Sequence, residues 1–393
     1  MDTTTHKDTM VPFTLSEDHL AFRQSVRTLA RSRYADSMLE RSQSEKFPLP
    51  EFGELGEAGL LGLLISESAG GQGGDVLAVG IAVEELAYAD PSIAYLAFAA
   101  NVSNALLATH GTEEVHRRWV TRGIAGEAVI CLALTEPGAG SDAANLSTKV
   151  TRVDGGWRIS GEKTSITQAV HADVAIVIAQ TNPGSGGKGI GMFLVDMADP
   201  GVSTQPIRDP GFKPLGRGSI FLDDVFVPDS HVLGEIGRGF GMVMHEFDLS
   251  RTLIALMNIG TAQHALDMAI EYSKQRQTFG RPLAANQGGS FVIAEHSTYV
   301  SAVRALGYHA LGLRMAGQPH TSEAAMLKWW GPLVAHNAIR DCIVLHGQVG
   351  WSDEMPLQAM LRDVSGCMIG DGTPQIQKLV IARELIGKEV LAR

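Results

Sequence analysis

The chain has 393 residues, of which 45% are hydrophobic and 19% are charged, and its formal net charge is −11. This length accommodates two or three domains with separate cores, and the composition is that of a soluble globular protein. The acidic charge argues against a nucleic-acid-binding protein, which normally presents a basic surface. Four arginines do cluster early in the chain, at Arg23, Arg27, Arg31 and Arg33, and we interpret them as a solvent-exposed helix face.

Cysteine usage and apolar segments indicate the compartment. The three cysteines, Cys131, Cys342 and Cys367, give neither a disulfide framework nor the paired spacing of a metal site, which suits a reducing environment. Residues 1–12 lack the basic-then-apolar plan of a signal peptide. No apolar run approaches the roughly 20 residues that span a bilayer. We therefore expect a cytoplasmic protein without a membrane segment or a bound metal.

Residues 1–128 are predicted to form an N-terminal helical domain. Ser16, followed by two acidic residues, is typical of a helix start, and residues 75–89 carry apolar side chains at helical spacing. Thr112, also followed by two acids, begins another helix. The glycine-rich segment 70–74 lacks the Lys-Ser/Thr pair of a phosphate-binding loop, so it is predicted to be a connector.

Residues 129–236 are predicted to form a middle antiparallel β domain. Short β-type runs follow one another between turn residues, and they cover Val129–Leu134, Trp157–Ser160, Val174–Gln180, Met192–Asp196 and Ile220–Val227. Turn signals every ten to fifteen residues favour antiparallel strands over alternating βαβ units.

Residues 237–393 return to a helical pattern. Long segments with few breakers cover Met242–Gln275, Gln287–Ala316, Ser322–Leu345, Leu357–Met368 and Pro374–Leu391. Long antiparallel helices joined by short loops form a bundle. The predicted fold class is therefore α+β, with a C-terminal domain of the four-helix-bundle type.

The strongest local motif is Leu134-Thr135-Glu136-Pro137-Gly138-Ala139-Gly140-Ser141-Asp142, directly after a β run. Its glycines let backbone amides approach a ligand closely, and its hydroxyl side chains can donate or accept hydrogen bonds. These features suit the edge of a flat heteroaromatic ring or a diphosphate. Taken alone, the segment could equally be a plain turn between strands.

The motif resembles the flavin-binding signature of acyl-CoA dehydrogenases. The similarity continues, in the family's order, through Gly161-Glu162-Lys163, Ile166-Thr167, Arg276…Phe279-Gly280…Gln287, Arg362-Asp363 and Gly370-Asp371-Gly372-Thr373…Gln375-Ile376-Gln377. It covers nearly the whole chain, from about residue 15 to residue 391. The resemblance implies the acyl-CoA dehydrogenase fold and an FAD cofactor.

The resemblance also implies roles for individual residues. Those that would contact FAD are Leu132, Leu134, Thr135, Gly140, Ser141, Ile166, Thr167, Arg276, Phe279, Gln287, Thr373 and Gln375. Arg276, Phe279 and Gln287 would reach the FAD of an adjacent subunit. An arginine suits the diphosphate of FAD, because the guanidinium fork matches phosphate oxygens. Those that would line the substrate cavity are Ser141, Asp248, Ser250, Arg251 and Gly372.

By the same resemblance, Asp371 is the catalytic base. Family members desaturate an acyl thioester: a carboxylate removes the α proton while a hydride passes from Cβ to flavin N5. The usual base is glutamate, so this chain's aspartate is one methylene shorter. Since a displacement of about 1 Å can cost a hundredfold in rate, we expect a substrate that lies closer to this loop, such as a branched or cyclic acyl group. Glu246 is a weaker candidate for the base.

Partners and alternatives follow from the same comparison. The resemblance implies an acyl-CoA or acyl-carrier-protein substrate, an electron-transferring flavoprotein as acceptor, and a homotetramer or homodimer. Many relatives carry a tryptophan beside the flavin where this chain has Ser165, which leaves open a flavin-dependent monooxygenase. A non-catalytic, flavin-carrying interaction protein is the third alternative.

Overall fold

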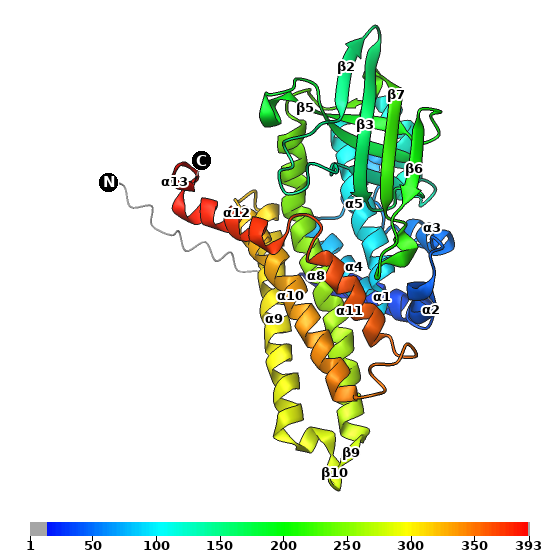
Figure 1. Ribbon diagram of the computed structural model, residues 1–393. Coiled ribbons are helices and arrows are strands. Elements are labelled where there is room, and N and C mark those ends of the chain that lie inside the picture. The colour runs from blue at the N-terminus through cyan, green and yellow to red at the C-terminus, as the bar shows by residue number, and fades with distance from the viewer. Residues whose placement is uncertain (1–13, 392–393) are drawn as a thin grey trace.

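The computed structural model describes residues 14–391, in which a helical region, a sheet and a second helical region follow one another (Figure 1). The N-terminal helices are α1 (Glu17–Arg33), α2 (Met38–Gln43), α3 (Leu49–Glu57), α4 (Val76–Ala89), α5 (Pro91–His110), α6 (Glu113–Val115) and α7 (Thr121–Ile124), with a π-helical turn at His116–Val120. The helix starts predicted at Ser16 and Thr112 are confirmed, since each accepts a hydrogen bond from a first-turn N–H. Asp75 caps α4 in the same way. Residues 70–74 connect two helical segments, as predicted.

Arg23 and Arg27 of α1 pack against α4, so their interpretation as part of a solvent-exposed face is wrong, whereas Arg31 and Arg33 are exposed. Arg27 donates to both carboxylate oxygens of Glu85, at 2.9 and 2.8 Å. Arg23 donates to the Tyr308 hydroxyl at 2.5 Å, and the Arg31 guanidinium lies 4.3 Å from the centre of the Tyr88 ring. The physical reason is that α4 carries buried carboxylates, which need cationic partners.

Helix α5 is the longest N-terminal helix, and its apolar residues face all sides. Asp90 caps it by accepting from two backbone N–H groups. Contrary to the sequence-based expectation, Pro91–His110 is long and apolar enough to cross a bilayer by length and composition. However, 72% of the segment is buried inside the protein, as expected of a core helix.

The middle region is one mixed sheet that caps one end of the helices (Figure 1). Its strands are β1 (Ile130–Ala133), β2 (Lys149–Val153), β3 (Gly156–Ile166), β4 (Val174–Gln180), β5 (Ile190–Asp196), β6 (Val202–Pro206), β7 (Gly218–Pro228) and β8 (Val232–Leu233). They are ordered β6-β7-β3-β2-β4-β5-β8, with β1 paired to β4. Most pairs are antiparallel, as predicted, but β1 and β2 both run parallel to β4. Each predicted β run coincides with a strand.

The C-terminal helices form a bundle below the sheet (Figure 1). They are α8 (Gly239–Gln275), α9 (Gln287–Met315), α10 (Thr321–His346), α11 (Leu357–Cys367), α12 (Pro374–Ile386) and α13 (Lys388–Leu391). A small hairpin of β9 (Gln277–Thr278) and β10 (Arg281–Pro282) joins α8 to α9 at the end far from the sheet. At 37 residues, α8 is about 55 Å long. It therefore links the sheet to this hairpin.

The sheet region and the bundle meet at a buried carboxyl group on α11. Asp363 is 2% exposed, and one of its oxygens accepts a 2.6 Å hydrogen bond from the Phe212 N–H. Burial raises the pKa of Asp363 to about 7, although this hydrogen bond acts in the opposite direction. The contact fixes Phe212, whose ring packs against Tyr95 of α5. Three parts of the fold therefore meet at this point.

Candidate active site

The glycine-containing loop after β1 is a turn that its own backbone hydrogen bonds close and that is unobstructed on one side. The N–H and C=O groups of Glu136 and Ala139 hydrogen-bond reciprocally at 3.1 Å. A Cβ atom added at Gly138 or Gly140 would meet nothing within 4 Å, so one side of the loop is free. Ser141 is exposed and Thr135 is partly exposed. Backbone amides and hydroxyl groups are therefore available to a flat ligand at this loop.

A buried ion pair fixes this loop to β3. Lys163 donates to Glu136 at 2.6 Å and to the Leu134 carbonyl at 3.0 Å, and neither charged side chain is exposed. Glu136 also accepts from Ser147 and from the Thr148 N–H. Burial raises the pKa of Glu136, but the ammonium and these donors outweigh it and hold the pKa at about 2. The pair joins two of the sequence motifs, a role that the sequence did not reveal.

The end of β3 has unusual backbone geometry. Ser165 and Gln168 have φ angles of 58° and 65°, a region that side chains other than glycine rarely adopt. Between them lie Ile166, which is buried, and Thr167, which is partly exposed. The Thr167 hydroxyl lies 3.4 Å from the Tyr95 hydroxyl. Such backbone outliers persist where the surrounding structure enforces them, and they cluster at functional sites.

Asp371 lies in the loop between α11 and α12, with φ at 54°. Its carbonyl accepts from Gln377 at 2.8 Å and from Arg251 at 3.5 Å, and the next carbonyl, that of Gly372, accepts from Gln377 at 3.3 Å and from Lys328 at 3.4 Å. Within residues 14–391, the N–H groups of Asp371 and Gly372 donate to no other group. Hydrogen bonds therefore hold the two carbonyls of this loop, while its two N–H groups remain available. Such a pair of donors suits binding of a carbonyl oxygen of a ligand.

Lys328 and Gln377 are residues whose roles the sequence analysis missed. Both are fully buried, and Lys328 also donates to the Cys367 carbonyl at 2.7 Å. Burial lowers the pKa of Lys328, while the nearby Asp371 acts to raise it. A lone lysine within an apolar helical stretch was the available signal, because a buried lysine needs acceptors.

Two of the three candidate substrate residues on α8, Ser250 and Arg251, contact Asp371. The Ser250 hydroxyl donates directly to the Asp371 carboxylate. Asp248 accepts from Arg251 at 2.9 Å and from Thr321 at 2.6 Å, so both of its carboxylate oxygens already have partners. Glu246 instead pairs with Arg314 at 3.1 Å. Its carboxylate is therefore already engaged in an ion pair, which makes it a weaker candidate for the base.

Arg276, Phe279 and Gln287 lie apart from these residues within one chain. All three are exposed, with Phe279 at 99%, on the β9–β10 hairpin and the start of α9. That hairpin lies at the opposite end of α8 from the sheet (Figure 1). Thr373 caps the start of α12, and Gln375 is exposed in its first turn. One copy of the chain thus separates the candidate diphosphate residues from the candidate ring-binding loop.

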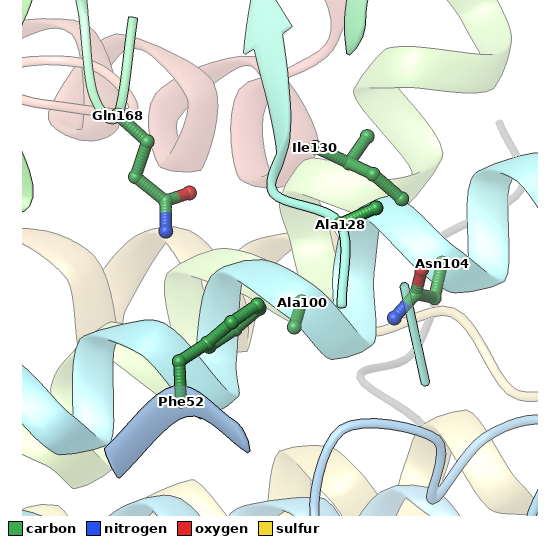
Figure 2. A pocket seen from close by; sticks show the side chains of 6 residues that line it. All are labelled: Phe52, Ala100, Asn104, Ala128, Ile130 and Gln168. Carbon is green, nitrogen blue, oxygen red and sulfur yellow. The ribbon is translucent and has the colours of Figure 1, made fainter. Parts of the chain in front are cut away.

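Figure 2 shows a gap in the packing between α3, α5 and the sheet region. It is lined by Phe52, Ala100, Asn104, Ala128, Ile130 and Gln168. The gap has no room for a water-sized molecule, so it does not represent the acyl-binding cavity.

The donor groups of the chain fit FAD. The open loop after β1 and the Thr167 hydroxyl supply hydrogen-bonding groups for a ring edge, and the exposed Arg276 supplies a guanidinium for a diphosphate. The loop's glycines leave space where side chains would otherwise obstruct the ligand.

Comparison with known proteins agrees with this geometry. The N-terminal, middle and C-terminal domain models of acyl-CoA dehydrogenases match residues 16–127, 131–225 and 237–386. An acyl-CoA dehydrogenase of Bacillus subtilis (strain 168) is 32% identical over 375 residues, which cover 95% of this chain and 99% of that protein. The caffeyl-CoA reductase-Etf complex subunit CarC of Acetobacterium woodii is 33% identical over 376 residues, with the same coverage.

Solved structures give the same result. The butyryl-CoA dehydrogenase of Megasphaera elsdenii matches with a TM-score of 0.91 and 31% identity, covering 95% of this chain and 100% of that one. The prolyl acyl carrier protein oxidase AnaB matches with a TM-score of 0.90 and 25% identity, again covering 95% and 100%. The chain therefore belongs to the acyl-CoA dehydrogenase family of FAD-dependent oxidoreductases that act on CH–CH bonds.

Proposed function

We propose that this protein desaturates an acyl thioester between its α and β carbons, with Asp371 as the base. The observation that carries the proposal is the Asp371 loop itself. A carboxylate lies beside two N–H groups, of Asp371 and Gly372, that have no partner within residues 14–391. A thioester carbonyl bound to these donors would present its α carbon to the carboxylate.

The chemistry divides between the chain and its cofactor. An α C–H beside a thioester is weakly acidic, so the developing enolate oxygen must be stabilised. Losing one such oxyanion donor typically costs about 3–4 kcal/mol. Gln377 and Lys328 hold the carbonyls of Asp371 and Gly372. The Asp371 carbonyl shares its peptide group with the Gly372 N–H, so this donor is held in place during proton removal. FAD, when bound, accepts the β hydrogen as a hydride.

The cofactor would be held by residues from two copies of the chain. Leu132, Leu134, Thr135, Gly140, Ser141, Ile166 and Thr167 lie on the loop after β1 and the end of β3, and they would contact the ring. Thr373 and Gln375, at the start of α12, would also reach the cofactor. The exposure of Arg276, Phe279 and Gln287, at the far end of α8, supports a homo-oligomer in which they reach a neighbouring FAD.

Substrate carrier and electron acceptor are further parts of the proposal. The relative from A. woodii is a subunit of an Etf complex, which supports an electron-transferring flavoprotein as acceptor. AnaB is an oxidase of a prolyl acyl carrier protein, so a carrier-protein thioester of a cyclic acyl group is an alternative to acyl-CoA. No observation favours a nucleic acid or a membrane as partner, and a cytoplasmic location stays a prediction.

Anaerobic titration of the FAD-bound protein tests the proposal. We expect at least one thioester, from a panel of straight, branched and cyclic acyl groups on CoA or carrier protein, to bleach the flavin absorbance. Asp371→Asn should retain FAD and the fold but lose at least 10³-fold in the rate of reduction, given the usual contribution of about 10²–10⁴ from general-base catalysis. An Asp371→Asn protein that is reduced at the wild-type rate would remove the assignment.

Reaction with oxygen separates the proposal from the monooxygenase alternative. Ser165 accepts a 3.1 Å hydrogen bond from Arg217, which also pairs with Asp209, so polar groups occupy the position where many relatives carry tryptophan. Rapid oxygen consumption coupled to substrate hydroxylation would favour the monooxygenase. A flavin that no thioester bleaches would favour the non-catalytic interaction protein.

A further inference from the structure

Ser250 and Asp371 are 121 positions apart in the chain, yet their side chains are in direct contact. Ser250 lies in the first half of α8 and is 2% exposed. An ionised carboxylate can only accept hydrogen bonds, so the single proton of the serine hydroxyl points toward the Oδ2 atom of Asp371. A hydroxyl group used in this way has no proton left to donate to a substrate.

This contact leaves the two carboxylate oxygens of Asp371 in different environments. Oδ2 accepts from Ser250, whereas Oδ1 has no hydrogen-bond partner among residues 14–391. The backbone of Asp371 is separately fixed through its carbonyl by Gln377. With backbone and Oδ2 both held, the orientation of Oδ1 is determined.

We propose that Ser250 is a positioning residue that orients the short Asp371 carboxylate, so that Oδ1 removes the α proton of the substrate. The inference rests on the proposed function and deepens it. The Cα–H bond breaks, the proton moves to Oδ1, and the electron pair of that bond forms the Cα=Cβ double bond, while bound FAD would take up the β hydrogen as a hydride. Ser250 keeps its own proton throughout.

This positioning role would compensate for a base that is one methylene shorter than the usual glutamate. A shorter side chain reaches less far from the loop, and a misplacement of about 1 Å can cost a hundredfold in rate. A hydroxyl group on the facing helix restricts the carboxylate to one orientation.

Stopped-flow reduction of the FAD-bound protein by its best thioester, measured anaerobically at neutral pH, tests the inference. In Ser250→Ala, we expect the reduction rate to fall about tenfold. The substrate dissociation constant should change less than threefold. An α-deuterated substrate should give a larger isotope effect, because proton removal becomes more rate-limiting.

Two further variants serve as controls. Ser250→Thr keeps the hydroxyl and should restore the wild-type reduction rate and isotope effect. Thr252→Val removes a buried hydroxyl from the same helix that donates to the Asp248 carbonyl at 3.1 Å rather than to Asp371, so the reduction rate and the isotope effect should not change. Crystal structures of wild type and Ser250→Ala should show the carboxylate rotated only in the variant.

Other outcomes overturn the inference in distinguishable ways. An unchanged reduction rate and an unchanged substrate dissociation constant in Ser250→Ala, with wild type fully reducible, refute the positioning role alone. A weakened substrate dissociation constant at an unchanged reduction rate assigns Ser250 to substrate binding instead. A wild-type protein that no thioester reduces removes the proposed function, and the inference falls with it.

Discussion

Replacing Glu136 with glutamine tests how the loop after β1 is held. The substitution removes the negative charge beside Lys163, and neither side chain has any exposure to solvent. The lysine would keep its 3.0 Å bond to the Leu134 carbonyl, but its charge would have no counterion. Removing one partner of a buried pair costs about 3–5 kcal/mol, and we expect a loss of unfolding free energy of that size.

The pH dependence gives an independent magnitude. The folded-state pKa of Glu136 is about 2, compared with an ordinary value of 4.5, so the folded chain releases this proton more readily than the unfolded chain. The resulting stabilisation is fully present above about pH 4.5 and is lost as the pH falls toward 2. A shift of this size corresponds to about 3 kcal/mol.

Urea unfolding of wild type and Glu136→Gln between pH 2 and 7 measures both effects. The difference between the two proteins should be largest at neutral pH and should shrink through the acid range. Glu271→Gln is a matched control, because Glu271 pairs with Lys274 on an exposed surface and such pairs contribute little. A neutral-pH loss below about 1 kcal/mol, or an unchanged acid limb, would refute the reasoning.

Two further predictions concern the joint between sheet and bundle and the far hairpin. Because the folded-state pKa of Asp363 is raised to about 7, the folded chain retains a proton that the unfolded chain releases, and stability should fall by a few kcal/mol between about pH 4 and 7. In Asp363→Asn, unfolding free energies measured over this range should lack that slope, and an identical slope would contradict the assignment. Arg276→Ala should weaken FAD binding about 10–100-fold without lowering the midpoint of thermal unfolding, since the side chain is exposed. Equilibrium dialysis with FAD measures the loss, Lys274→Ala on the same exposed helix end is the control, and unchanged affinity in Arg276→Ala would contradict a role in cofactor binding.

The sequence predicted elements whose residues carry local signals. Capping residues such as Asp75 and Thr112 mark helix starts, and Val174–Gln180 is a continuous apolar run that forms a strand buried throughout. Among the strands that were not predicted, β2 and β6 are largely exposed, so they have polar residues and no clear alternation. The burial of α5 was not foreseen either, because a helix that is apolar on all sides has no distinct face.

The candidate site was predictable as a set of motifs but not as a set of contacts. The resemblance drew attention to Asp371 and to Ser250, but it assigned Ser250 to the substrate and did not indicate that the two side chains meet. Lys163 stood in a quoted motif without a role, since its pairing with Glu136 depends on how β3 packs beside β1. Contacts between distant residues follow from tertiary packing, which a single sequence does not encode in any local pattern.

The length of α8 has a consequence for mixed assemblies. Helix α8 carries Ser250 in its first half and leads into Arg276 at its C-terminal end, and the two residues are about 39 Å apart along the helix axis. If each copy completes its neighbour's cofactor site, a defect in the hairpin spares the chain's own base and disables the adjacent centre. A subunit with a defective hairpin would then inactivate the cofactor site of a wild-type neighbour, whereas a defect at Asp371 would affect only the subunit that carries it.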